Sequence, residues 1–388
     1  MAILVLLSPI LITDARASHG VGTELTYTCL GGNDYLFTLN YYRDCSGSAM
    51  ASSQTITIAS ASCGLTSTLM LSQVGPPEDI SPICPSALST CAGGTEPGVE
   101  KYTYQSTFTL PSNCPDWMFS FDQCCRNGDI TNLVTPTSQS VYIRSMLNNS
   151  SGICNNSPIF TTSPAPYICD SQQINYNISA FDPDGDSLYY TLVNALGATG
   201  TALTYVTGYS PTYPLSTIDD TVYFDNSSGN LNITPDSTHV AIITVLVEEY
   251  RNGTLIGSVM RDVQIRVLDC PSNVAPYMSS AGIINLSGGV LLDSNSVSIC
   301  VGNTITFDIV GADDNSGDTL EILSDLSITI PNATFTTSGV NSITASFSWA
   351  PTLTDVGLNT FIITVQDNAC PILGMQSYQF DIEVSSPT

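Results

Sequence analysis

Apolar and polar residues alternate with period two along most of the chain, and clusters of Gly, Asn, Pro and Ser interrupt the alternation. β-branched and aromatic residues fill many of the apolar positions, which is typical of half-buried strands. The alternating segments 24–29 and 35–42 flank Gly31-Gly32-Asn33-Asp34, a strong β-hairpin signal. Further strands are expected at 55–59, 68–71, 102–110, 117–121 and 141–147. Since a helical period is absent, the pattern predicts an all-β chain of sandwiches or barrels.

An internal repeat organises the second half of the chain. Segment 168–182 matches segment 299–313 at a constant offset of 131 residues, through an Ile-Cys pair, three alternating apolar positions and an aspartate. The tetrapeptide Ile-Ile-Thr-Val at 242–245 recurs at 362–365. We therefore expect three tandem domains: a Cys-rich, disulfide-rich β domain at 18–154, followed by two Ig-like β-sandwiches at 155–272 and 273–388.

The N-terminus has the pattern of a signal peptide. Residues 2–12 form an apolar run that is too short to span a bilayer, and Ala15-Arg16-Ala17 provides a small-x-small cleavage site. We predict a signal peptide at 1–17 and a mature chain that begins at Ser18. A buried core helix is the alternative. No later stretch reaches the length of a transmembrane helix, so we expect no direct membrane insertion.

The net charge of the chain argues against two classes of binding partner. The 388 residues include 8 Lys and Arg against 34 Asp and Glu, which gives a net charge of -26. A nucleic-acid binder needs basic side chains to displace the counterions of phosphates, so a nucleic-acid partner is not expected. An anionic membrane surface would repel the chain for the same reason.

Thirteen cysteines in a chain with a signal peptide indicate an extracellular protein with disulfides. An odd number leaves one thiol free or paired with another molecule. We expect the adjacent Cys124 and Cys125 to have separate partners. Strand order places Cys169 and Cys270 at the same end of the second domain, so they form the best single pair; a pair between Cys300 and Cys370 remains open.

An acidic loop in each repeat is the strongest chemical signal. Asp182, Asp184 and Asp186 alternate around Gly185, and this density of hard oxygen ligands suits Ca²⁺. The glycine comes too early for an EF-hand. The second copy is looser and contains Asp313, Asp314 and Asp318. The alternative for both loops is a solvated acidic turn, because Asp and Gly are common turn residues.

Linkers rich in Asn and Pro precede both repeats and contain Asn156, Asp269 and Asn273. They look like the cadherin inter-repeat linker, and segment 181–188 resembles the cadherin Asp-x-Asp loop. Segment 347–357 is similar to a motif of dystroglycan-type cadherin-like domains. This resemblance implies that linker and loop share structural Ca²⁺, which would stiffen the domain junctions.

The first domain points to a narrower family. Its motifs include Tyr42-Arg43-Asp44-Cys45, Asn113-Cys114-Pro115-Asp116-Trp117 and Cys124-Cys125-Arg126-Asn127, and the stretch from Glu249-Tyr250 to Arg261-Asp262 fits the same group. They resemble the N-terminal region of large secreted Bacteroidota surface proteins, which are called gliding-motility-associated or adhesin-like. The resemblance implies a protein of the bacterial cell surface.

Neither catalysis nor sugar binding has a strong motif. The chain has two histidines, no Gly-x-Ser-x-Gly elbow and no Ser-x-x-Lys pair, so we expect no enzyme. A carbohydrate-binding module is the alternative, with aromatic candidates that are more often core residues in sandwiches: Trp117, Tyr41, Tyr42, Tyr189 and Tyr190. The sequence thus predicts a non-catalytic, Ca²⁺-stiffened surface or adhesin module, whose partners are surface glycans, other surface proteins or a second copy of the chain.

Overall fold

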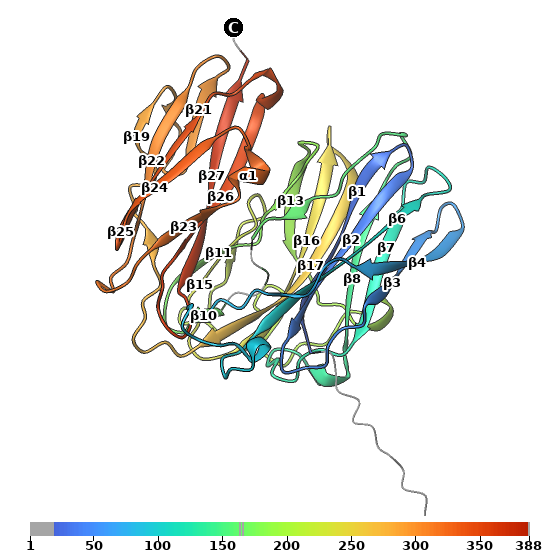
Figure 1. Ribbon diagram of the computed structural model, residues 1–388. Helices are drawn as coiled ribbons and strands as arrows, with labels where there is room; N and C mark the ends of the chain where they lie inside the picture. Colours follow the sequence, from blue (N-terminus) through green and yellow to red (C-terminus); the bar gives the residue numbers. More distant parts are fainter. Residues whose placement is uncertain (1–18, 163, 165–166, 387–388) are drawn as a thin grey trace, which may run out of the picture.

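The computed structural model describes residues 19–162, 164 and 167–386 (Figure 1), so the predicted signal peptide lies outside the described residues. The described chain is all-β, as the alternation predicted. Its helical elements are the single turn α1 (Leu326–Thr329) and four three-residue 3-10 turns, at Thr90–Ala92, Pro136–Ser138, Ala198–Gly200 and Leu353–Asp355. Among the described residues, no helix has the length and hydrophobicity needed to cross a membrane.

The N-terminal part contains all seven strands predicted for it, with somewhat different ends. Its strands are β1 (Gly20–Gly31), β2 (Asp34–Asp44), β3 (Ser53–Ser60), β4 (Leu65–Gln73), β5 (Glu78–Asp79), β6 (Val99–Thr109), β7 (Trp117–Cys124) and β8 (Ser140–Leu147). The hairpin signal at 31–34 is confirmed, since β1 pairs antiparallel with β2. Alternate residues of these strands enclose an aromatic core, in which the ring centroids of Phe37 and Phe119 are 4.7 Å apart.

The second and third parts share one topology. The second contains β9 (Ile159–Phe160), β10 (Tyr167–Cys169), β11 (Ile174–Asn177), β12 (Ala180–Phe181), β13 (Ser187–Leu192), β14 (Tyr223–Phe224), β15 (Asn230–Ile233), β16 (Val240–Arg251) and β17 (Thr254–Leu268). The third contains β18 (Tyr277–Met278), β19 (Ile284–Ser287), β20 (Val290–Leu291), β21 (Ser296–Cys300), β22 (Ile305–Ala312), β23 (Glu321–Ser324), β24 (Thr334–Gly339), β25 (Ser342–Trp349), β26 (Gly357–Gln366) and β27 (Met375–Ser385).

The strand pairing of the second part recurs in the third. The order β10-β17-β16-β13 corresponds to β21-β27-β26-β23, with a parallel first pair in both. The order β11-β15-β14 corresponds to β22-β25-β24. Each part therefore forms a β-sandwich of the kind that the sequence repeat predicted, with its own buried core.

Strand β17 belongs to two parts of the molecule at once. The N-terminal strands run in the order β1-β2-β6-β4-β3-β7-β8, and one edge of β17 joins both ends of this series. Residues 257–259 pair with β8, and residues 261–263 pair with β1. The other edge of β17 pairs with β16 along nearly its whole length. The hydrogen-bonded sheet is therefore continuous across the domain boundary predicted between residues 154 and 155.

Buried ion pairs reinforce this shared strand. Arg126 and Asp262 are both fully buried, and their two nitrogen–oxygen contacts are each 2.8 Å long. The neighbouring Arg261 places its Nε 2.9 Å from Glu24 and its guanidinium 4.6 Å from the ring centre of Phe160. Two consecutive residues of β17 thus anchor the N-terminal part through charge.

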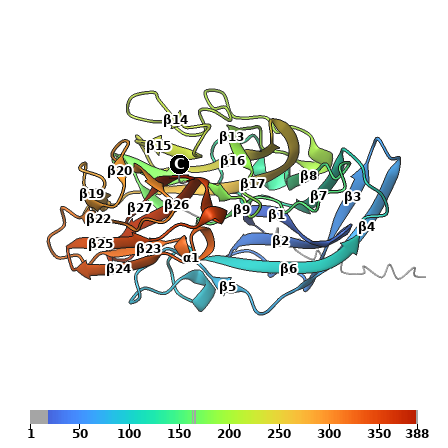
Figure 2. The same ribbon diagram turned by 90° about the horizontal axis from the view of Figure 1, so that it is seen from above.

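The third part lies beside the other two rather than in line with them (Figures 1 and 2). Cys84, in the N-terminal part, is bonded to Cys370, in the turn between β26 and β27. Ile83 and Ile372 form a β-bridge next to this disulfide, and Thr161 donates a hydrogen bond of 2.7 Å to Asp325. The chain is therefore closed back on itself by a covalent link.

The structure assigns every cysteine. The disulfides are Cys29–Cys154, Cys45–Cys91, Cys63–Cys114, Cys84–Cys370, Cys124–Cys125 and Cys169–Cys270, and Cys300 is free. Cys169–Cys270 is the pair that strand order singled out. The expectation of separate partners for Cys124 and Cys125 is wrong, because every other cysteine except Cys300 is bonded elsewhere. Cys300 does not pair with Cys370, because the strand pairing places them at opposite ends of the β26–β27 hairpin.

We predict that Arg126→Met lowers the free energy of unfolding by about 3–5 kcal/mol, because it leaves Asp262 buried without its guanidinium. The double variant Arg126→Met/Asp262→Leu should recover most of this loss. Urea unfolding measures both, with the exposed Arg144→Met as the control. An equal, small loss in Arg126→Met and Arg144→Met would contradict the role given to the pair.

Candidate metal centres

The first acidic loop wraps around one of its own carboxylates. Oδ1 of Asp182 accepts hydrogen bonds from the backbone N–H groups of Asp184 and Asp186, at 2.9 and 3.0 Å. Gly185 has a φ of +78°, a left-handed conformation that favours glycine. The Asp-x-Asp-Gly-Asp sequence therefore folds into a tight turn that gathers its side chains on one side.

A fourth carboxylate, which the sequence analysis missed, completes the first centre. Glu249 of β16 joins Asp182, Asp184 and Asp186, and one oxygen from each of the four lies within 4.8 Å of the others. Glu249 is 0% exposed and Asp182 is 6% exposed. Oδ2 of Asp182 and both carboxylate oxygens of Glu249 are buried and accept no hydrogen bond within the described chain. Two carboxyl groups thus place three buried oxygens in this cluster without a hydrogen-bond donor among the described residues.

Burial makes this arrangement costly when the groups are ionised. Burial raises the pKa of Asp182 from 3.8 to about 6, and the charges of Asp186 and Asp184 add to the effect. Burial, together with the charge of Asp182, also raises the pKa of Glu249 well above its usual range. A cation at this position would stabilise the ionised forms of both groups and so oppose both shifts.

An arginine covers the outer side of the first centre. Nε of Arg251 donates to both oxygens of Asp186, at 2.8 and 3.0 Å. Its Nη2 donates to Asn155 at 2.7 Å, lies 3.4 Å from Asp184 and also contacts Asp186. Arg251 therefore compensates Asp184 and Asp186, whereas the buried oxygens of Asp182 and Glu249 stay without a donor.

The linker contacts the loop through Asn156, which the sequence analysis predicted as a metal ligand. The backbone N–H and the side-chain amide of Asn156 each donate to Asp184 at 2.8 Å. The side-chain oxygen of Asn156 instead accepts from the backbone N–H of Cys29 on β1, at 3.0 Å. In this arrangement Asn156 positions Asp184 and joins the loop to the N-terminal part.

The second centre is built from three carboxylates and an amide. Asp313, Asp318 and Asp367 bring their oxygens within 4.8 Å of one another. Asp367 is held by backbone N–H groups of Ala369 and Gly374, and it accepts from Nδ2 of Asn273 at 2.9 Å. Oδ2 of Asp313 and Oδ1 of Asn273 are buried without a donor in the described residues. Burial raises the pKa of Asp313 and of Asp367.

The surroundings of the second centre contain no cationic side chain of their own. Residues 267–388 include no Lys, Arg or His, whereas residues 273–388 include eleven Asp and Glu. Among the described residues, no ion pair reaches any of the three carboxylates. The second centre therefore lacks the kind of compensation that Arg251 provides at the first.

Two predicted ligands lie apart from these clusters. Asp314 is exposed and accepts a hydrogen bond from the hydroxyl of Tyr277, and Asp269 is exposed in the linker. The acids that the sequence analysis missed, Glu249 and Asp367, follow the repeated Ile-Ile-Thr-Val by four and two residues. An acid within four residues after this tetrapeptide in both repeats was a signal that could have found them.

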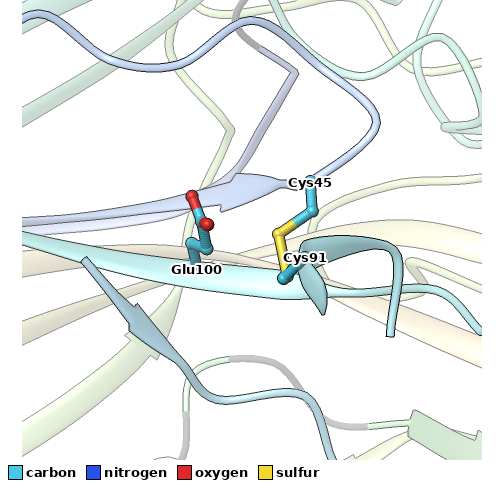
Figure 3. Close-up of side chains that lie close together, drawn as sticks. All are labelled: Cys45, Cys91 and Glu100. Carbon is cyan, nitrogen blue, oxygen red and sulfur yellow. A yellow bond between two sulfur atoms is a disulfide. The ribbon is translucent and has the colours of Figure 1, made fainter. Parts of the chain in front are cut away.

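A third group of potential ligands is explained by a covalent bond. Cys45, Cys91 and Glu100 lie close together, but Figure 3 shows the two sulfur atoms joined as a disulfide. Glu100 forms an ion pair with Arg43. The cysteines are therefore not available as thiolate ligands in this state.

The aromatic candidates for sugar stacking are mostly core residues. Trp117, Tyr41, Tyr42 and Tyr190 are at most 2% exposed, and only Tyr189 of the five presents its ring, at 46% exposure. An aromatic platform built from these residues is therefore absent from the described surface.

Comparisons with known proteins add little to the structure. No family model and no curated protein matches the chain. Among solved structures, an E-to-A variant of three titin Ig domains is 10% identical to this chain and gives a TM-score of 0.18. The alignment spans 96% of this chain and 99% of the titin fragment. The eight N-terminal Ig domains of the Down syndrome cell adhesion molecule are 9% identical, cover 95% of this chain and 37% of that chain, and give a TM-score of 0.23.

An endo-fucoidan hydrolase of glycoside hydrolase family 107 is also similar at this level. It is 13% identical, with coverage of 82% of this chain and 39% of that chain and a TM-score of 0.18. At such TM-scores, none of these structures supports an argument about this chain. The all-β architecture and the disulfides come from the structure itself, and they are typical of an extracellular protein.

Without Ca²⁺, we predict that Asp182→Asn becomes more stable relative to the unmodified chain as pH rises from about 4 to above 6. A carboxyl group with a raised pKa keeps its proton in the folded state after the unfolded chain has lost it, so its contribution to stability falls across this window. Asn stays neutral and can still accept both backbone hydrogen bonds. Melting temperatures in EDTA measure the difference, and a constant difference across the window would contradict the prediction.

Proposed function

We propose that this chain is a non-catalytic module of an extracellular surface protein, in which bound Ca²⁺ and six disulfides fix the fold for contact with other surface molecules. The disulfides support the extracellular setting, because such bonds persist in oxidising compartments. The net charge of -26 suits a soluble surface that binds cations.

The observation that carries the Ca²⁺ proposal is the set of buried carboxylate oxygens without donors. Asp182, Glu249 and Asp313 all contribute such oxygens. An ionised carboxylate buried without a partner costs several kcal/mol, so it either takes up a proton or binds a cation. Exposed acidic turns have no such requirement, which distinguishes these clusters from the solvated-turn alternative.

The chemistry of the donors favours Ca²⁺ among common metals. Both clusters offer oxygen ligands, and neither contains a histidine or a free thiol. Ca²⁺ takes six to eight oxygens in flexible geometry and often binds carboxylates together with amide carbonyls. Asp182, Asp186 and Glu249 would hold one ion, and Asp313, Asp318 and Asp367 would hold the other, with Oδ1 of Asn273 beside it.

The proposed role of the ions is local order and stability. The first centre joins the linker at 155–156, the loop at 182–186 and β16, and Asn156 extends this network to β1. Because β17 already connects the N-terminal and second parts, the ion adds stability to a junction whose strands are continuous. This differs from an ion that sets the angle between two separate domains.

The bacterial setting rests on sequence motifs. The proposal that the chain belongs to a Bacteroidota cell-surface or gliding-associated protein is supported by the resemblance of its motifs. Two of those motifs contain Arg126 and Asp262, which form the buried ion pair. The pair gives these motifs a role in the fold.

Other surface proteins are the partners that we propose, and surface glycans are the alternative. The burial of four of the five aromatic candidates removes the main support for glycan stacking. Self-association is supported by Cys300, which is exposed and forms no disulfide within the chain.

Ca²⁺ should stabilise the folded chain measurably. At ten to a hundred times its dissociation constant, each bound ion adds about 1.4–2.7 kcal/mol to the free energy of unfolding. We expect Glu249→Gln and Asp367→Asn each to remove about half of the gain, as measured by urea unfolding with Ca²⁺ and with EDTA.

The matched control is Asp314→Asn, which removes an exposed acid from the second loop. It should keep the full Ca²⁺ effect. No Ca²⁺ effect in the unmodified chain, or an equal loss in Asp314→Asn and Asp367→Asn, would contradict the proposed centres.

A further inference from the structure

The two acidic clusters differ in one respect that the proposed function does not explain. The first holds a guanidinium in direct contact with two of its four carboxylates, and the second is built in a segment without a basic residue. Arg251 is the last residue of β16, two positions after Glu249 on the same strand. One short segment therefore provides both a buried ligand for a cation and a cation of its own.

We infer that Arg251 is a built-in counter-ion that competes with Ca²⁺ for the first centre. The inference rests on the proposed function, because it concerns the ion that the same carboxylates would bind. In the ion-free state the guanidinium holds Asp184 and Asp186 in place, and an entering ion would meet a positive charge already bound to the same carboxylates.

The hydrogen bonds of Asp186 show why the two cations compete. Both of its carboxylate oxygens accept from Nε of Arg251, and Nη2 makes a further contact with the same group. These contacts occupy most of the acceptor positions of Asp186, so Ca²⁺ would have to share this carboxylate with the guanidinium or displace one of its contacts. Two positive charges a few ångströms apart also repel, so the guanidinium weakens the affinity of the centre even where it stays nearby.

The remaining contacts show why the guanidinium does not replace the ion. Arg251 reaches Asp184, Asp186 and Asn155, but the buried oxygens of Asp182 and Glu249 receive no donor from it. The centre is thus divided into an outer half that the guanidinium compensates and an inner half that still requires a cation. A residue that merely oriented the metal ligands would strengthen binding, whereas a competing counter-ion weakens it.

Removal of Arg251 should raise the affinity for Ca²⁺ and lower the stability of the ion-free chain, and these two opposite effects test the inference. The experiment uses the chain from Ser18 onward with Asp318→Asn, which weakens the second centre so that the first dominates the titration. Calorimetric titration with Ca²⁺ compares this chain with the same chain carrying Arg251→Met. Loss of the guanidinium should tighten binding about tenfold and, in EDTA, should lower the melting temperature.

Two further variants keep the result interpretable. Arg144→Met makes the same change in net charge at an exposed position of β8, and it should change the affinity less than about twofold. Arg251→Gln can keep a hydrogen bond to Asn155, and it should also tighten binding if Arg251→Met fails to fold.

The outcomes separate this inference from the proposed function. Tighter Ca²⁺ binding by the Arg251→Met variant, together with its lower melting temperature in EDTA, supports both the inference and the proposed function. Equal or weaker binding after removal of the guanidinium, in a chain that does bind Ca²⁺, overturns the counter-ion and leaves the proposed function standing. No binding in any variant, and none in the unmodified chain, overturns both.

Discussion

The fold depends on the sharing of β17 between two parts of the molecule. Its main chain pairs with β16 on one edge and with both end strands of the N-terminal series on the other. The consecutive residues Arg261 and Asp262 then place buried charges against Glu24 and Arg126. Because a buried charge without its partner is strongly destabilising, these contacts fix the register of β17 against the N-terminal part. The disulfide Cys84–Cys370 closes the third part onto this frame.

Charge is distributed so that the few cations lie where the fold needs them. Of the seven basic residues after position 18, five form the ion pairs that join β2, β16, β17 and the segment at 126–129 to nearby acids. The third part contains no basic residue, so none of its eleven Asp and Glu side chains can pair with a Lys or Arg of the same part. In the proposed account, the buried carboxylates there would take a cation from solution, whereas Arg251 already compensates part of the first centre. The proposed metal binding would thus be a consequence of how sparingly this chain uses Lys and Arg.

Local sequence patterns were sufficient to predict the strands and the acidic loops. The alternation located the seven N-terminal strands, and the repeat placed equivalent strands in the second and third parts, because these features depend on neighbouring residues. The shared β17 could not be predicted, since the pairing of residues 257–263 with β8 and β1 spans more than a hundred residues of sequence. Glu249 and Arg251 follow the first acidic loop by more than sixty residues, and Asp367 follows the second by about fifty, so neither set was joined to the predicted sites. Cys84 is 286 residues from its partner. The acids of the loops were visible as a motif, but the contact of Glu249 and Asp367 with those loops appears only in the folded structure.

The central claim is that two clusters of buried carboxylates hold cations, and anomalous diffraction tests it most directly. Crystals of the mature chain soaked with Tb³⁺, a luminescent and strongly scattering substitute for Ca²⁺, would locate each ion without reference to stability. The account predicts one anomalous peak among Asp182, Asp186 and Glu249 and a second among Asp313, Asp318 and Asp367. Peaks confined to exposed acids such as Asp314, with none at either buried cluster, would contradict it.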